Sequence, residues 1–400
     1  ECTHRFTLRA DRAVLEVDVE VFNRTDLPQT FLWLANPAVH VDENHQSVFP
    51  PDVNAVMDHG KRDTSAFPIA TGEYYKVDYA PGTDISRYRN IPVPTSYMAH
   101  HSDYNFVGSY DHGRAAGLLH VCNHHVSPGK KQWTWGTADF GRAWERHLTD
   151  EDGPYIELMC GVYTDNQPDF SWLMPGETKA FTQYFMPYQG VGMVKNATVE
   201  AAVGFDMESD RATVRTYTTS RQPNAKVAVR SVGAVIWEGQ FDGGPGSCFQ
   251  ATFPLPNDIP REGLEIDVVS NDGQQLVDWT VPAETQRPMP EPAKPIESPD
   301  KLDSIESLYL AGLHLEQYRH ATRQPADYYR EALRRDGGDV RCNMSIGKLL
   351  YRRGRFAEAE PHLRRAIERL VRHNPNPYDG EPFYLLGCTL EKLERYEEAF

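Results

Sequence analysis

The spacing of apolar residues changes its period once along this chain, near a proline-rich segment. Up to about residue 281 the sequence shows short alternating runs interrupted by Gly, Pro, Asn and Asp, and residues 15–22 read Leu-Glu-Val-Asp-Val-Glu-Val-Phe. A period of two is typical of strands that bury one face. Beyond residue 300 the period is that of a helix. The chain is therefore expected to be a multidomain protein, with β domains first and an α domain after them.

The β-rich part is expected to form two domains. Residues 1–194 predict a large antiparallel β-sandwich, in which residues 31–35 pair with residues 15–22 as in a hairpin. Residues 195–281 carry regularly spaced strand patterns and predict a small β-sandwich of immunoglobulin-like size. Residues 282–300 contain six prolines, which favour an extended linker of semi-rigid character.

The helical part, residues 301–400, carries an internal repeat. Gly312, Gly347 and Gly387 each precede a Leu by three residues; Gly312 to Gly347 is 35 residues and Gly347 to Gly387 is 40. This pattern resembles the tetratricopeptide family, whose period is about 34 residues, although a generic helical bundle is the alternative. The resemblance implies an α-solenoid that offers a surface for a protein partner or for self-association. The last repeat stops at Phe400, so we expect the chain to be part of a longer protein.

Charge and composition exclude several classes of function. The formal net charge of −16 argues against a nucleic-acid partner, because phosphate binding needs a basic surface. No window approaches 18 consecutive apolar residues, so neither a membrane-spanning helix nor a membrane partner is expected. The six cysteines form no CxxC motif, which favours reduced thiols and a cytoplasmic location. The sequence names no cofactor.

One carboxylate, Glu157, lies inside an apolar strand pattern. Glutamate is depleted from strands, and an inward-facing one costs free energy unless a polar group meets it. A sugar hydroxyl is one such group; a backbone donor or an arginine in a purely structural site is the alternative. Asp165 and Asp169 follow Glu157 by 8 and 12 residues across a turn, so either is a candidate for its catalytic partner.

The segment that begins at Glu157 resembles the galactose mutarotase-like domains. It continues through Asn166-Gln167-Pro168 to a Pro-Gly-Glu turn at residues 175–177. The resemblance implies that Glu157 is a general base acting on an anomeric hydroxyl. Residues 32–40, which correspond to the strand bearing the mutarotase acid, lack a histidine at that place, so epimerisation is not favoured.

The order of the domains carries a resemblance of its own. A mutarotase-like sandwich, a small β domain and tetratricopeptide repeats occur in this order in a poorly characterised group of large bacterial proteins suspected of glycoside processing. The chain resembles that group over its whole length.

Histidine, tryptophan and arginine residues near Glu157 in the sequence are candidates for substrate binding. Imidazole suits proton transfer and hydrogen bonding to hydroxyls, and aromatic faces suit sugar pockets, although satisfied loop histidines and core tryptophans are the alternative. The candidates are His100, His101, His124, His125, Trp133, Trp135 and Arg142.

A zinc site made by Cys122, His124 and His125 is a weaker alternative. Neighbouring residues on a strand point to opposite faces, and no metal is predicted.

Together these patterns predict a carbohydrate-active protein. The first hypothesis is that the protein is a glycoside hydrolase-like enzyme, which binds sugar in the first β-sandwich and uses carboxylate acid/base chemistry. The alternative is a non-catalytic glycan-binding or scaffolding protein that acts through its tetratricopeptide repeats. The sequence names neither the sugar nor the linkage.

Overall fold

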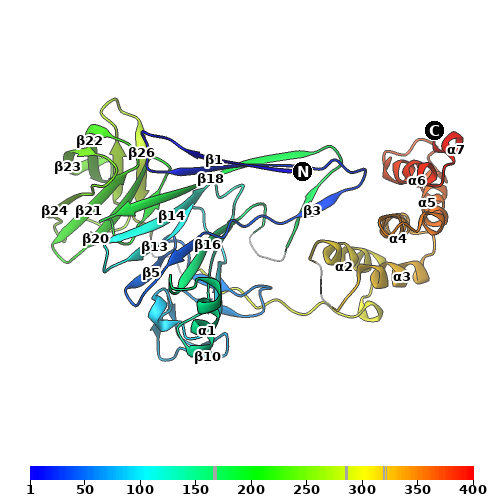
Figure 1. Ribbon diagram of the computed structural model, residues 1–400, viewed down its shortest axis with the longest axis horizontal. Coiled ribbons are helices and arrows are strands. Elements are labelled where there is room, and N and C mark those ends of the chain that lie inside the picture. Colours follow the sequence, from blue (N-terminus) through cyan, green and yellow to red (C-terminus); the bar gives the residue numbers. More distant parts are fainter. Residues whose placement is uncertain (165–168, 284–286, 319, 321) are drawn as a thin grey trace. The chain divides into compact units, whose positions relative to one another are not determined.

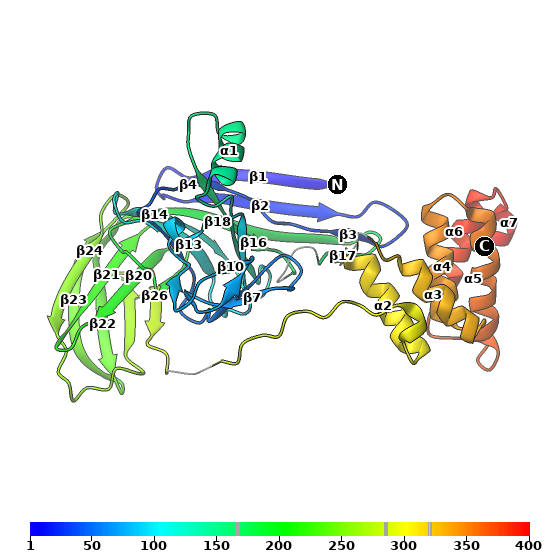
Figure 2. The same cartoon turned by 90° about the horizontal axis from the view of Figure 1, so that it is seen from below.

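The computed structural model describes residues 1–164, 169–283, 287–318, 320 and 322–400 (Figures 1 and 2). The chain divides into two compact units. The first consists of Glu1–Asn23, Phe31–Leu173 and Glu177–Ala293; the second consists of Arg24–Thr30, Met174–Gly176 and Lys294–Phe400. Figure 1 shows the strands from blue to yellow-green and the helices α2 to α7 from yellow to red. The change from β to α structure follows the change in hydrophobic period.

A six-stranded antiparallel sheet forms one layer of the first sandwich. Its strands, in spatial order, are β1 (Cys2–Leu8), β2 (Leu15–Phe22), β18 (Thr178–Gln189), β14 (Ala116–Cys122), β13 (Phe106–Asp111) and β5 (His45–Val48). In β2 the alternating pattern gives the expected result, because Val17, Val19 and Val21 are buried.

A second six-stranded antiparallel sheet packs against the first. Its order is β4 (Ala38–His40), β16 (Tyr155–Gly161), β15 (Gly129–Thr134), β12 (Thr95–Ala99), β6 (Ala55–Met57) and β7 (Thr64–Ala66). The core between the layers combines Tyr97 and Cys160 from this sheet with Val107 and Cys122 from the first. The predicted antiparallel β-sandwich is thus confirmed.

Two expectations within this sandwich are wrong. Residues 31–35 do not pair with β2, because β1 and β18 already occupy its two edges. Instead, β3 (Gln29–Phe31) pairs with β17 (Ser171–Leu173). The helix α1 (Asp139–Leu148) interrupts a region expected to be all-β, since its ten residues are too few to establish a sustained helical period.

Short elements complete this part of the chain. They are the strand pairs β9 (Glu73–Tyr74) with β10 (Val77–Asp78) and β8 (Ile69–Ala70) with β11 (Thr83–Asp84), and the 3-10 helix η1 (Tyr88–Asn90).

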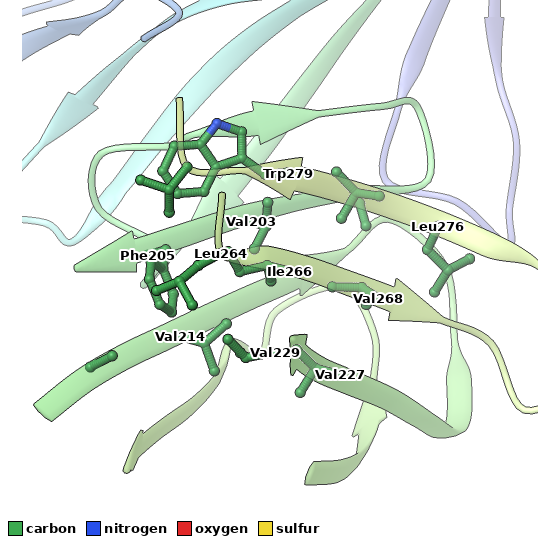
Figure 3. Close-up of a cluster of buried hydrophobic side chains, with 14 of the residues drawn as sticks. Val203, Phe205, Val214, Val227, Val229, Leu264, Ile266, Val268, Leu276 and Trp279 are labelled. Atoms are coloured by element: carbon green, nitrogen blue, oxygen red, sulfur yellow. The ribbon is translucent and has the colours of Figure 1, made fainter. Parts of the chain in front are cut away.

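Two four-stranded sheets build a smaller sandwich. The first is β19 (Asn196–Ala197), β20 (Ala201–Met207), β21 (Arg211–Thr218) and β24 (Phe249–Pro254); the second is β23 (Ala234–Gly243), β22 (Gln222–Ser231), β25 (Glu265–Val269) and β26 (Gln275–Thr280). Val203 and Val214 of one sheet and Val227 and Ile266 of the other are fully buried in a common core (Figure 3). A β-sandwich is present here, and its immunoglobulin-like character stays a prediction.

The C-terminal part is helical. After residues 287–298, which form neither helix nor strand, come η2 (Pro299–Lys301), α2 (Ile305–Tyr318), α3 (Pro325–Arg335), α4 (Val340–Arg352), α5 (Phe356–Val371), α6 (Glu381–Lys392) and α7 (Tyr396–Ala399). The repeated glycines lie where helices approach closely: Gly312 faces the ring of Tyr329, and Gly347 faces Leu363. The glycine spacing found in the sequence thus coincides with close helix packing, and the tetratricopeptide assignment itself stays a prediction.

Replacing Gly347 with Ala is expected to destabilise the helical part by about 1–3 kcal/mol. A Cβ atom at this position would lie 2.7 Å from Cδ2 of Leu363, a fully buried side chain. The free energy of unfolding in urea measures the effect. Gly337→Ala is the matched control, because its Cβ would meet only the Leu333 carbonyl oxygen at 3.6 Å. Equal stability of the two variants would contradict this account of the glycine.

Two further observations concern the expected environment of the chain. None of the helices in the described ranges is long and apolar enough to span a membrane. All six cysteines lie in those ranges, and all are free thiols.

Candidate functional site

Glu157 lies on the face of the second sheet that points away from the first sheet. It is directly opposite Trp133 of β15, and Trp133 is directly opposite Ser96 of β12. Directly opposite residues on neighbouring strands share a face, as do residues two apart on one strand, so Lys131 belongs to the same group. The intervening residue Gln132 points the other way and hydrogen-bonds to Ser47 of the first sheet. We call the group around Glu157, Lys131 and Trp133 the Glu157 face.

A chain of hydrogen bonds runs across this face. Nζ of Lys131 lies 2.7 Å from Nε2 of His59, and Nδ1 of His59 lies 2.8 Å from Oγ of Ser96. Oγ of Ser96 in turn lies 2.7 Å from the hydroxyl of Tyr75. With Lys131 protonated, its ammonium donates to Nε2, which places the imidazole hydrogen on Nδ1, directed at Ser96. The position of the Lys131 side chain is therefore fixed by partners from other parts of the chain.

The pKa values of Glu157 and Lys131 are shifted toward neutrality. Burial raises the pKa of Glu157, and the charge of Lys131 and a 2.9 Å hydrogen bond from Nδ2 of Asn36 partly offset that rise. Burial also lowers the pKa of Lys131 to about 8, and the charge of Glu157 opposes this shift. Lys131 is 3% exposed, whereas Glu157 is half-buried. An acid and an amine perturbed in this way are typical of groups that exchange protons with a substrate.

Tryptophan side chains form an aromatic shelf beside Glu157. The rings of Trp133 and Trp135 meet edge to face with centroids 4.6 Å apart, and Trp135 stacks on Trp144 at 5.4 Å. Nε1 of Trp135 donates to the hydroxyl of Tyr155 at 3.2 Å. Trp133 and Trp135 are half-buried and Trp144 is 45% exposed, so the shelf remains open to solvent. The two tryptophans chosen from the sequence thus lie together beside Glu157.

The helix α1 adds a buried carboxyl group near this shelf. Glu145 is 3% exposed, and burial raises its pKa while the nearby charge of Arg142 lowers it. The charges of Glu157 and Glu145 both act on Tyr155, whose pKa is raised mainly by burial. Arg142 is exposed and donates from Nε to the Thr137 carbonyl oxygen at 3.0 Å. Its charge acts on Glu145, so Arg142 belongs to the surroundings of that carboxyl group.

The four predicted histidines lie at another place on the sandwich. His101 contacts Asp103 at 3.0 Å, Nδ1 of His124 lies 2.9 Å from Oδ1 of Asn105, and the rings of His124 and His125 are 3.9 Å apart. His100 is exposed just after the end of β12.

The strand register separates these histidines from Glu157. They lie near the end of β12 and the start of β15. At this level of the sheet Gly129 pairs with Gly161, which is four residues from Glu157 along β16. At about 3.3 Å per residue this is roughly 13 Å. The histidines therefore form a polar cluster of their own.

Of the two predicted carboxylate partners, Asp165 lies outside the described residues. Asp169 is half-buried, just ahead of β17. The pairing of either residue with Glu157 stays a prediction.

The sequence reasoning did not select Lys131, His59 or Asn36. Lys131 lies two residues before Trp133 and so on the same face of a strand, which was the available signal for it. His59 follows β6 and Asn36 precedes β4. They are 72 and 121 residues from their partners, so only the tertiary fold brings them to this face.

Potential metal ligands occur in the interior. Among the described residues one group of such side chains lies close enough together to hold an ion, namely His120, Cys122 and Cys160, all of them buried.

Two family models match successive parts of the chain. Residues 3–189 match a domain of unknown function, DUF5107. Residues 196–279 match the second domain of YphG-like proteins. Each match covers less than half of the 400 residues.

Several solved structures resemble the chain at low identity. A TPR-domain containing protein from Parabacteroides distasonis is 17% identical, with a TM-score of 0.40, over all of this chain and 53% of its own length. A putative aldose 1-epimerase from Escherichia coli is 12% identical over 47% of this chain and 60% of its own, with a TM-score of 0.32. A galactose mutarotase-like protein from Clostridium acetobutylicum is 13% identical over 47% and 55%, with a TM-score of 0.29. The chain thus spans little more than half the length of these proteins.

Proposed function

We propose that this protein is a carbohydrate-active enzyme of the glycoside hydrolase type, with the Glu157 face as its substrate site. The observation that carries the proposal is the combination on one sheet face of a half-buried carboxyl group, a buried ammonium group and an open aromatic shelf. The resemblance of the Glu157 segment to mutarotase-like domains supports the same site.

The aromatic shelf and the polar groups have separate roles in this proposal. The apolar face of a sugar ring stacks on Trp133 or Trp135, while its hydroxyls hydrogen-bond to Asn36 and Lys131. Lys131 already has its place fixed by His59, so little side-chain freedom is lost when a ligand binds.

Hydrolysis of a glycosidic bond needs a proton donor and a base or nucleophile. A carboxyl group with a raised pKa, such as Glu157, suits the donor role because it stays protonated closer to neutral pH. Asp165 and Asp169 are the partners proposed from the sequence. Glu145 is a further candidate, because its charge and that of Glu157 both raise the pKa of Tyr155.

The proposal is tested by screening the chain against aryl glycosides and oligosaccharides, with binding measured by calorimetry and turnover by product release. Trp133→Ala is expected to weaken binding of the best ligand by about tenfold or more, because a stacking surface is lost. Tyr378→Ala removes a fully exposed aromatic ring in the helical part and serves as the control. Binding without turnover would favour the non-catalytic glycan-binding alternative, and binding that survives Trp133→Ala would place the sugar elsewhere.

A further inference from the structure

Three side chains with metal-ligating atoms meet in the core between the two large sheets. His120 and Cys122 are two residues apart on β14 and so share a face, and Cys160 comes from β16 in the facing sheet. The imidazole nitrogen and the two sulfurs all lie within 4.8 Å of one another. None of the three residues is more than 2% exposed. The cluster therefore bridges the two layers of the sandwich.

The imidazole of His120 is held in the orientation of a metal ligand. Its Nδ1 lies 3.2 Å from the Leu158 carbonyl oxygen, and because a carbonyl only accepts, Nδ1 carries the hydrogen. Nε2 is then an unprotonated acceptor. It is buried and makes no hydrogen bond of regular geometry among the described residues, and the side chain of Gln183 is its polar neighbour. A histidine that binds a metal through one ring nitrogen usually donates from the other to a carbonyl or carboxylate. An unused buried acceptor costs free energy, which a bound ion would recover.

Lys130 is a second buried polar group that lacks a partner among the described residues. It is 0% exposed, and its Nζ has no hydrogen-bond partner within the described ranges. Its charge acts on Cys122, Cys160 and His120 alike. A buried amine without a partner costs free energy, and sulfurs held as thiolates by a metal would offer it hydrogen-bond acceptors.

We propose that Nε2 of His120 and the Sγ atoms of Cys122 and Cys160 bind one thiophilic d10 metal ion, Zn(II) or Cu(I). Each thiol loses its proton to solvent when the ion enters, which leaves two thiolates and one neutral imidazole as ligands. Sulfurs bound at about 2.3 Å around a tetrahedral ion lie about 3.8 Å apart, a separation that fits within the 4.8 Å group. With Zn(II) these ligands make a neutral shell, and with Cu(I) the shell carries one negative charge beside Lys130.

This site is independent of the Glu157 face. The ligands point into the core, whereas Glu157 lies on the outward side of β16. The ion would tie β14 to β16 and so join the two sheets, which is a structural role. Three protein ligands can satisfy Cu(I), whereas they leave the fourth position of a tetrahedral Zn(II) ion open.

The test is metal analysis of the full chain, purified under reducing conditions and then loaded separately with Zn(II) and with Cu(I). After gel filtration, about one ion per chain should remain bound in either the Zn(II)-loaded or the Cu(I)-loaded sample. The sample that retains its ion identifies the metal. Cys122→Ser and Cys160→Ser are expected to lower this content at least tenfold. Cys342→Ser is the matched control, because it removes a fully buried thiol of α4 outside the cluster.

A second measurement needs no variant and so does not depend on how the serine substitutions fold. Titration of the apo chain with metal in weak buffer should release about two protons per ion bound. Cobalt(II) added in place of zinc should give a thiolate-to-metal charge-transfer band. Retention of less than a tenth of an ion in both samples, or an ion bound without proton release, would overturn the proposal.

Discussion

Glu157→Gln is expected to lower kcat/KM on the glycoside that the screen identifies by about 10²–10⁴-fold, the usual contribution of a general acid or base. The amide keeps the size of the side chain and still offers an oxygen to Nδ2 of Asn36, but it has no acidic proton to transfer to the leaving group. Initial rates over a range of substrate concentrations measure the effect. The control is Glu151→Gln, which should leave the rate unchanged. Glu151 is exposed and lies six residues before Glu157, ahead of β16.

The same variant separates catalysis from a structural role of Glu157. Burial raises the folded-state pKa of this carboxyl group, so its contribution to stability is fully present below its unfolded pKa and is lost as pH rises through the folded value. A neutral glutamine avoids that loss, and the melting temperature at pH 7 should stay the same or rise slightly. A clear fall in melting temperature with activity retained would show that Glu157 is a structural carboxylate.

The pH profile gives a further check on the donor role. An acid with a raised pKa is active while protonated, so kcat/KM of the wild-type chain should fall as pH rises through that pKa. The residual activity of Glu157→Gln should lack this limb. An identical limb in both proteins would assign the titration to another group.

Part of this site follows from the sequence, and part of it depends on strand register. Glu157 could be chosen because it is a charged residue within an apolar strand pattern, and Trp133 and Trp135 because they lie two residues apart and so share a face of a strand. Lys131 and His59 meet across strands, and no local pattern gives the partner of a residue 72 positions away. The register also explains why the predicted histidines lie apart from Glu157.

Competition between strands accounts for the main error in the fold. Residues 31–35 have the composition of a strand, but an antiparallel strand needs a free edge, and both edges of β2 are taken. Helix α1, which carries Glu145, is short enough to be missed within a β-rich sequence. By contrast, the alternation in β2 depends directly on burial, and that prediction is confirmed. The repeated glycines mark positions where helices approach closely.

Lys131→Met is expected to stabilise the first sandwich near neutral pH while it impairs the proposed activity. Burial lowers the pKa of Lys131 from 10.5 to about 8, so the folded chain holds this proton less tightly than the unfolded chain does. The difference of about 2.5 pKa units corresponds to about 3 kcal/mol at 1.36 kcal/mol per unit. Methionine fills a similar volume without a charge, and water can reach the half-buried His59 in place of the lost ammonium.

The sign of the pH dependence distinguishes this effect from ordinary repacking. Between about pH 8 and 10.5 the unfolded wild-type chain binds more protons than the folded one, so wild-type stability should rise with pH across this window. The stability advantage of Lys131→Met should be largest at pH 7 and should shrink toward pH 10.5. Melting temperatures of both proteins across this range measure it, and Lys226→Met, at an exposed position of β22, should show no such trend.

Activity and stability should therefore change in opposite directions in Lys131→Met. Without the ammonium group the pKa of Glu157 rises further, so the fall in kcat/KM moves to higher pH, and the hydroxyl contact of Lys131 with substrate is lost. A variant that is both more stable and less active would indicate that the fold keeps a costly buried charge for the sake of the site. Lower stability of the variant at pH 7 would instead show that the contact of Lys131 with His59 stabilises the fold by more than the burial of the charge costs. Unchanged activity of the variant would remove Lys131 from the proposed chemistry.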